Sequence, residues 1–169
     1  PNFFPPLVGQ TFQQRQLAIF KEIRLRRRFE MFEAVCLPSL IGQSDQGFNV
    51  IIVTSRNLPK WAFDRLASLV INLPNVYVRP YRAGANIRRV YKRSAFEMLD
   101  PAASTVATFR LDDDDGLAKD YIARLRRHLK QINIGKTVTF SHGHQLVLSG
   151  QSLQLWTDNR KNGSAGLAL

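Results

Sequence analysis

The chain has 169 residues, of which 44% are hydrophobic and 22% are charged. This composition excludes a disordered or fibrous protein and predicts one folded domain. Lys and Arg number 24 against 13 Asp and Glu, a net charge of +11, which indicates an anionic partner and leaves nucleic acid, a phosphorylated metabolite and an acidic membrane face open.

The N-terminal part of the chain predicts an arm, a helix, a loop and a strand. Residues 1–12 are rich in Pro and Phe and predict an extended arm. Residues 13–37 predict a helix that ends before Pro38 and carries arginines opposite an apolar stripe. The stripe consists of Leu25, Phe29, Phe32 and Cys36. Residues 42–47 predict a loop, and the β-branched run at 48–55 predicts a strand buried on both faces of a parallel sheet.

The remaining segments continue an alternation of helices and strands. We expect helices over residues 61–70, 84–99 and 119–132. We expect strands over residues 75–81, 105–111, 137–140, 144–149 and 152–156. This order predicts an α/β fold with a mostly parallel sheet flanked by helices and a β-rich C-terminal part. Ligands of such sheets bind beyond the carboxyl ends of the strands, so we expect one functional rim formed by Ser55, residues 81–84 and residues 112–115.

The chain has a single cysteine, which limits the possible disulfides and metal sites and indicates the redox state of the compartment. Cys36 excludes an internal disulfide and a cysteine-rich zinc module, and a reducing compartment is the simplest interpretation. No apolar run approaches the roughly 18–20 residues of a spanning helix, and no signal-peptide layout precedes the first helix. We therefore expect a cytoplasmic protein. The chain begins at Pro1, which leaves open that it is incomplete at one or both ends.

Four consecutive aspartates, Asp112 to Asp115, follow the strand predicted at 105–111. Adjacent carboxylates repel one another, and a hard divalent cation such as Mg²⁺ or Mn²⁺ relieves that repulsion while keeping sites for phosphate oxygens. The alternative is a solvated acidic turn that caps the following helix. The position at the end of a strand favours the metal site.

An Asp-x-Asp signature at the end of a central strand is the hallmark of GT-A glycosyltransferases. The surrounding sequence resembles the bacterial family of putative rhamnosyl transferases, which is related to the family 2 glycosyltransferases. The resemblance rests on three stretches: residues 28–59, 75–99 and 108–125. The first contains LPSL followed by a Gln, a Phe, a Ser and LP, and the third contains RLDDDD. It covers more than half of the chain.

The resemblance implies a single GT-A-like domain over residues 1–169 and a nucleotide-sugar donor whose diphosphate is bridged by Mn²⁺ or Mg²⁺. Asp112 would face the ribose or the metal water, Asp114 would be the principal metal ligand, and Asp115 would support it. Asp113 would occupy the variable position on the donor side. The other register, which pairs Asp113 with Asp115, stays open.

Two features depart from the GT-A pattern. The fold normally opens with a strand that contacts the nucleotide base, and residues 1–24 do not predict one. The acceptor-side half is also short, so the catalytic base is not identified. The segment GANIRRVYKR resembles the family 2 donor-pocket motif in location, although Lys92 and Arg93 replace more conservative positions.

Basic residues gather between the strands predicted at 75–81 and 105–111. They are Arg82, Arg88, Arg89, Lys92 and Arg93. The expected contacts to the donor are Ser55, Arg88 and Arg89. The two arginines are chosen because guanidinium groups bind diphosphates with two parallel hydrogen bonds. A solvated helix face is the alternative for the other cations.

Several other residues are weaker candidates. The RLRRR run at 24–28 predicts either a solvated helix face or contacts to phosphates or acidic lipid. His142 and His144 lie on one face of a predicted strand and offer a further metal ligand, although loop histidines without a role are commoner. Cys36 falls on the helical core stripe, which argues against a nucleophile. Asn162 begins a glycosylation sequon that has no signal peptide to make it relevant.

The first hypothesis for function is a metal-dependent glycosyltransferase that moves a sugar, rhamnose by the family's naming, from a nucleotide sugar to a glycan or lipid-linked acceptor. A carboxylate or His not yet identified would deprotonate the acceptor hydroxyl. The alternatives are a basic non-enzymatic module for nucleic acid or anionic membrane, and a metal-dependent phosphohydrolase or nucleotidyltransferase. Under the first hypothesis no nucleic acid is expected, and peripheral contact with the inner membrane face stays open.

Overall fold

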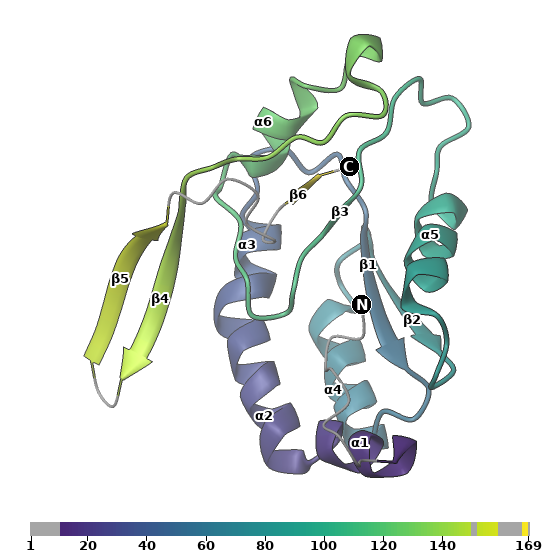
Figure 1. Ribbon diagram of the computed structural model, residues 1–169, viewed down its shortest axis with the longest axis vertical. Helices are drawn as coiled ribbons and strands as arrows, with labels where there is room; N and C mark the ends of the chain where they lie inside the picture. The colour runs from purple at the N-terminus through teal and green to yellow at the C-terminus, as the bar shows by residue number, and fades with distance from the viewer. Residues whose placement is uncertain (1–10, 150–151, 159–166, 169) are drawn as a thin grey trace. The chain divides into compact units, whose positions relative to one another are not determined.

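A computed structural model describes residues 11–149, 152–158 and 167–168 (Figure 1). Most of the predicted N-terminal arm and the Asn162 sequon lie outside these residues. The chain divides into two compact units, which are described separately. Unit 1 comprises residues 1–31 and 49–96, and unit 2 comprises residues 32–48 and 97–169.

The helix predicted at 13–37 is divided into shorter helices. In unit 1, α1 (Phe12–Ile19) and α2 (Glu22–Met31) are separated at Phe20 and Lys21. Thr11 begins α1 with a capping box, in which its Oγ1 accepts the backbone N–H of Gln14 at 3.2 Å and its own N–H donates to Gln14 Oε1 at 2.8 Å. The break shows that the apolar period alone does not reveal where the helix starts again.

A parallel β–α–β arrangement forms the centre of unit 1. Strand β1 (Val50–Ser55) pairs with β2 (Val76–Tyr81) in parallel, and α4 (Lys60–Val70) connects them (Figure 1). Both strands and this helix are predicted by the sequence. The prediction that β1 is buried on both faces is wrong, because all six of its residues are only partly buried. Within the described residues β1 pairs with one strand, β2, so no second strand shields the other edge of β1 from solvent.

Helix α2 packs against α4 through aromatic rings. The Phe29 and Trp61 ring centroids lie 6.1 Å apart, the Arg26 guanidinium lies 5.2 Å from the Trp61 centroid, and Arg65 lies 5.0 Å from Phe29. Arg26 also donates to Glu22 at 2.6 Å, and Arg24 donates to the Ile19 carbonyl at 3.1 Å. Two arginines of the RLRRR run therefore contact protein groups, and the solvated-face interpretation is incomplete.

Unit 2 begins with a π-helical turn, η1 (Phe32–Cys36), followed by α3 (Leu37–Ile41). The prediction that the helix ends before Pro38 is wrong. Pro38 lies in the first turn of α3, where a missing N–H is tolerated because the first turn of a helix has no partner for it. The helix ends instead at Gly42, whose N–H donates to the Pro38 carbonyl at 2.8 Å.

Helix α6 (Tyr121–Arg126) carries the core of unit 2. Its buried residues Tyr121, Ile122 and Leu125 pack against partly buried apolar side chains. These are Phe48, Ala107, Phe109, Leu117, Val138 and Phe140. Tyr121 packs between Phe109 at 5.2 Å and Phe140 at 5.1 Å. The helix predicted at 119–132 is shorter than expected and is followed by η2 (Gln131–Asn133), a 3₁₀ turn.

The C-terminal strands form two small antiparallel sheets. Strand β4 (Gly143–Ser149) and strand β5 (Ser152–Asp158) form where strands are predicted, and they pair in the antiparallel direction. The strand expected at 105–111 is limited to β3 (Phe109–Arg110), which pairs with β6 (Leu167–Ala168) in the antiparallel direction. Within the described residues this ladder comprises two pairs, Phe109 with Ala168 and Arg110 with Leu167. Residues 137–140 form no strand and contribute one bridge residue, Val138.

The structure is therefore mixed α/β, with a small parallel sheet and several helices, while the GT-A arrangement stays a prediction. Helix α5 (Ile87–Glu97) completes unit 1, three residues later than expected at its start. All four residues of the predicted stripe are buried, among them Leu25 and Cys36. No helix in the described part of the chain is both long and apolar enough to cross a bilayer.

Replacing Tyr121 with Ala tests the packing of unit 2. We expect a loss of about 3 kcal/mol in the free energy of unfolding, because the ring is 7% exposed and fills the space between two aromatic neighbours. Urea denaturation of Tyr121→Ala measures the loss. Tyr91→Ala, at a position that is 36% exposed, is the matched control and should lose much less. Equal losses would contradict the assignment of Tyr121 to the core.

Candidate functional site

The four aspartates form a tight turn directly after β3. The Asp115 N–H donates to the Asp112 carbonyl at 3.1 Å, which closes the turn. Asp113 and Asp114 are exposed, whereas Asp112 and Asp115 are partly buried. Two carboxylates of the turn thus face solvent, where a ligand can reach them.

The carboxylates of the turn oppose the ionisation of Asp115. Burial raises the pKa of the Asp115 carboxyl, and the neighbouring Asp112 and Asp114 raise it further. The guanidinium of Arg110 offsets part of the charge of Asp112, at 3.3 Å between Nε and Oδ1. The turn therefore concentrates negative charge, and the repulsion disfavours the ionised form of Asp115.

The aspartate turn packs against the π-helical turn η1. A methyl group added at Gly116 would lie 3.1 Å from Cγ1 of Val35 and 3.7 Å from Cβ of Ser39, so a glycine permits this close approach. Burial raises the pKa of the Cys36 thiol to about 11, with contributions from Asp115 and Asp114. The thiol is therefore protonated at neutral pH, in agreement with the predicted core position of Cys36. Single π turns of this kind occur frequently at functional sites.

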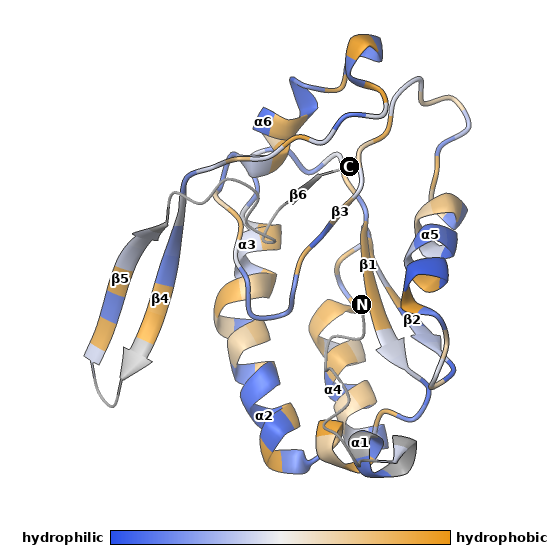
Figure 2. Ribbon diagram, in the orientation of Figure 1, coloured by the Kyte–Doolittle hydropathy of each residue, from blue (hydrophilic) through white to orange (hydrophobic). Residues whose placement is uncertain are grey.

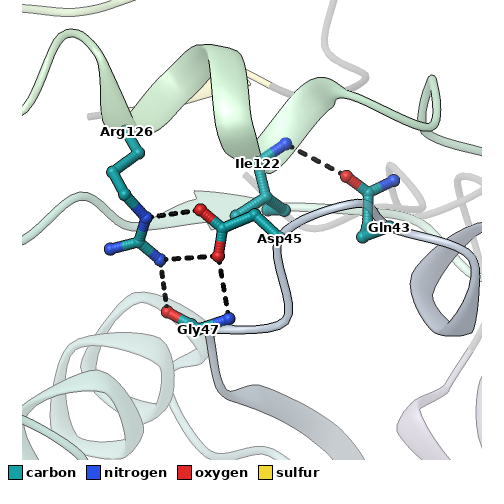
Figure 3. Close-up of polar contacts among 5 residues, drawn as sticks. All are labelled: Gln43, Asp45, Gly47, Ile122 and Arg126. Atoms are coloured by element: carbon teal, nitrogen blue, oxygen red, sulfur yellow. Dashed lines mark hydrogen bonds and ion pairs between the residues drawn. The ribbon is translucent and has the colours of Figure 1, made fainter.

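A buried glutamine bonds to three segments of unit 2, and Figure 3 shows its hydrogen bond to Ile122 of α6. Gln43 is 5% exposed, and its Nε2 donates to the carbonyls of Ser39 at 2.9 Å and Ala118 at 2.8 Å. Its Oε1 accepts the backbone N–H of Ile122 at 3.0 Å. One side chain thereby holds the end of α3, the segment after the aspartates and the first turn of α6.

Sequence reasoning misses the role of Gln43. The residue lies in the predicted loop at 42–47 and within the motif that carries the family resemblance, and the pattern assigns it no role. The available signal is the presence of a long polar side chain directly after Gly42, at the end of an apolar helix. That signal does not reveal partners that lie 75 and 79 residues further along the chain.

An ion pair fixes the same loop to α6 (Figure 3). Arg126 Nε donates to Asp45 Oδ2 at 2.5 Å, and Arg126 Nη2 donates to Asp45 Oδ1 at 3.0 Å and to the Gly47 carbonyl at 2.7 Å. The Gly47 N–H donates to Asp45 Oδ1 at 2.9 Å. The hydrogen bond from Arg126 lowers the pKa of Asp45, and the Gly47 N–H lowers it further.

The predicted donor contacts lie at one end of the parallel strand pair in unit 1. Ser55 and Tyr81, the last residues of β1 and β2, are paired in register. The Ser55 Oγ accepts the Asn57 N–H at 3.1 Å, and the Tyr81 hydroxyl lies 2.7 Å from Ser94 Oγ on α5. The structure thus places Ser55 and residues 81–84 at the same edge of the sheet. The aspartates belong to unit 2, so one rim over all three segments stays a prediction.

Helix α5 presents the basic residues that follow this edge. Gly84 adopts a positive φ of 79°, and Asn86 Oδ1 accepts the Arg89 N–H at 3.2 Å. Five cations of this region are exposed: Arg82, Arg88, Arg89, Lys92 and Arg93. No acid occurs between Asp64 and Glu97. Cations in the first turn of a helix oppose the helix dipole, so a bound anion would relieve an unfavourable charge arrangement.

The metal prediction rests on the donor chemistry of the aspartate turn. Within the described residues, no group of three or more His, Cys, Asp and Glu side chains is arranged to hold a metal ion. His142 and His144 are exposed and complete no such group. Mg²⁺ commonly binds through one or two carboxylates together with phosphate oxygens, and the turn at Asp114 and Asp115 offers that donor set.

Comparison with known proteins identifies one family. The family model described as "putative rhamnosyl transferase" matches residues 7–169, which is nearly the whole chain. A search of curated proteins and a search of solved structures found no match. The resemblance noted in the sequence is therefore confirmed by a match that also extends over the C-terminal strands.

The Asp45–Arg126 pair predicts a pH-dependent contribution to stability. Because the folded-state pKa of Asp45 is lowered, the contribution is complete above the ordinary value of about 4 and is lost as the pH falls through the folded-state pKa. We expect Asp45→Asn to lower the free energy of unfolding by about 1 kcal/mol at pH 7 and to lose less of its stability on acidification. Urea denaturation at several pH values measures both effects.

Asp64→Asn is the matched control for this experiment. Asp64 pairs with Lys60 at 2.6 Å on the exposed side of α4, and such pairs contribute about 0.5 kcal/mol or less. If both variants showed the same small loss, Asp45 would contribute no more than an ordinary surface pair.

Proposed function

Because the chain belongs to the family of putative rhamnosyl transferases, we propose that it transfers a sugar from a nucleotide-sugar donor to a hydroxyl group of an acceptor. The observation that carries the proposal is the aspartate turn, which gathers four carboxylates after β3 and raises the pKa of Asp115 through burial and their mutual repulsion. The family name supports the transfer of a sugar, and rhamnose is the proposed sugar.

The donor would bind through its diphosphate to the basic helix of unit 1. Arg88 and Arg89 lie in the first turn of α5, and the N-terminus of a helix favours a bound anion. Ser55 lies at the carboxyl end of β1, where open α/β sheets bind ligands. These three residues are the proposed contacts of the chain to the donor.

A divalent cation, Mn²⁺ or Mg²⁺, would be held by Asp114 and Asp115. Asp112, which also forms an ion pair with Arg110, would be a further carboxylate ligand. Such an ion supplies neutralising charge for a departing nucleoside diphosphate. Asp113 is exposed beside Asp114 and is the proposed residue on the ribose side, together with Asp112. The GT-A arrangement is proposed on the same basis.

The protein's own contribution would be a preorganised charge pattern. Gln43 holds the Ala118 carbonyl, three residues after Asp115, and Gly116 permits a close approach to Val35 of η1. The carboxylates would thus be positioned before a charged group leaves. The acceptor would be a glycan or a lipid-linked glycan whose hydroxyl attacks the anomeric carbon and loses its proton to a base that is not assigned.

Replacing Asp114 with Asn tests the proposed ligand. The substitution keeps the shape of the side chain and removes one negative charge, so we expect transfer to fall by at least ~10²-fold. The stability should stay level or rise slightly, because the four carboxylates then repel one another less. Product analysis with a panel of UDP-, GDP- and dTDP-sugars measures transfer, and thermal unfolding of the same sample measures stability.

Asp113→Asn is the comparison within the same turn. It removes the same charge from a residue proposed to contact the ribose and not the metal, so it should weaken donor binding and reduce transfer less than Asp114→Asn. If Asp113→Asn were the inactive variant and Asp114→Asn the active one, the other register would hold. An active but destabilised Asp114→Asn would indicate a structural cap and would overturn the metal assignment.

The double variant Arg88→Gln and Arg89→Gln tests the donor contacts. We expect the Kd of a nucleoside diphosphate to rise about tenfold for each guanidinium group removed. Calorimetry with UDP, GDP and dTDP measures the affinity. The control is Lys92→Gln with Arg93→Gln, which removes the same charge from later positions on α5. If both double variants weakened binding equally, diffuse charge attraction in place of defined hydrogen bonds would be indicated.

A further inference from the structure

The β4–β5 hairpin exposes apolar side chains on both of its faces. Leu146 is opposite Leu155 in the register, and Leu153 lies on the same face two residues from Leu155. These side chains are 55%, 64% and 62% exposed, respectively. Val147 and Trp156 lie on the other face and are 43% and 60% exposed. Figure 2 shows hydrophobic bands on both strands of the hairpin.

A basic segment of the same unit precedes the hairpin. Residues 121–157 contain five Lys and Arg and no Asp or Glu. Arg126 is paired with Asp45, and Arg124 lies 4.7 Å from the Phe140 ring. The other three cations, Arg127, Lys130 and Lys136, are exposed.

Large aliphatic side chains alternate with these cations. Ile132 is 76% exposed and Ile134 is 64% exposed, and both lie between Lys130 and Lys136. Phe140 connects this segment to the hairpin, because its ring contacts Tyr121 at 5.1 Å and His128 at 6.3 Å, and β4 begins three residues later. The cationic segment 127–136 and the apolar hairpin therefore belong to the same unit and are joined by residues 137–142.

We propose that residues 127–136 and the β4–β5 hairpin together form a surface that docks onto an anionic lipid bilayer. Lys and Arg attract anionic headgroups, and exposed Ile, Leu and Trp enter the boundary between headgroups and acyl chains. The five Lys and Arg of residues 121–157, a stretch without an acid that ends at Asp158 of β5, complement a negative surface. This site differs from the RLRRR run, in which Arg26 is engaged by Glu22 and Trp61.

A second copy of the chain is a less suitable occupant. Seven-residue strands give the hairpin a face of roughly 240 Å², whereas a stable interface buries about 800 Å² on each partner. A protein partner that packed on one face would also leave the apolar side chains of the other face in water. A bilayer interface surrounds both faces, and it meets the cations of residues 127–136 with opposite charge.

The test compares vesicles with and without anionic lipid. We expect the chain to sediment with vesicles of phosphatidylcholine and phosphatidylglycerol, to bind pure phosphatidylcholine far more weakly, and to dissociate as salt is added. In a Trp61→Phe background, the fluorescence of Trp156 should shift to shorter wavelength with the anionic vesicles. No binding to either vesicle would overturn the proposal.

Two sets of variants locate the surface. Arg127→Gln, Lys130→Gln and Lys136→Gln together should weaken vesicle binding about 10²-fold, since each cation near the surface contributes about fivefold. Lys21→Gln, Arg27→Gln and Arg56→Gln remove the same charge from exposed positions of unit 1 and should weaken it far less. Equal losses in the two triple variants would show that net charge alone drives binding, which contradicts a defined surface.

The aliphatic part is tested by Leu146→Ser with Leu155→Ser. Both side chains are exposed, so the variant should keep its thermal unfolding temperature while vesicle binding falls at least tenfold. Size-exclusion chromatography completes the test. A wild-type dimer that this variant converts to a monomer, with vesicle binding unchanged, would show that a second copy covers the hairpin and would overturn the proposal.

Discussion

The hydrogen bonds of Gln43 are the interaction on which the organisation of unit 2 depends. A buried amide must have its polar atoms paired, and those of Gln43 bond to backbone groups of three separate segments. A shorter amide side chain, such as that of Asn, would not reach both α3 and α6. The aspartate turn ends three residues before one of these partners, Ala118, so the hydrogen bonds of Gln43 fix the chain close to the turn.

Charge is divided unequally between the two units. Unit 1 contains 15 of the 24 Lys and Arg residues and 3 of the 13 Asp and Glu residues, while unit 2 contains the remaining acids. The net charge is therefore +12 in unit 1 and −1 in unit 2. Under the proposed function, the cations of unit 1 would serve the phosphates of the donor and the carboxylates of unit 2 would serve a metal.

The elements that local pattern determines can be predicted, and those that depend on distant contacts cannot. The β-branched run of β1 and the amphipathic period of α4 are local signals, and both predict the elements that form. The length of β3 depends on its distant partner β6, and Pro38 is accommodated by the change of helix type at η1, so neither follows from the pattern. At the candidate site, composition reveals the acids, whereas Gln43 is missed because its partners are remote.

Neither unit is continuous along the chain, and this affects the order in which the protein can fold. Residues 32–48 belong to unit 2 but are synthesised before most of unit 1. Gln43 emerges about 75 residues before Ala118, its partner, so its amide must remain hydrated through the synthesis of β1, α4, β2 and α5. The loop that finally closes carries an entropic cost and slows folding. A nascent chain that ends at residue 96 therefore contains all of unit 1 and also α3, whose contacts through Gln43 to Ala118 and α6 cannot yet form.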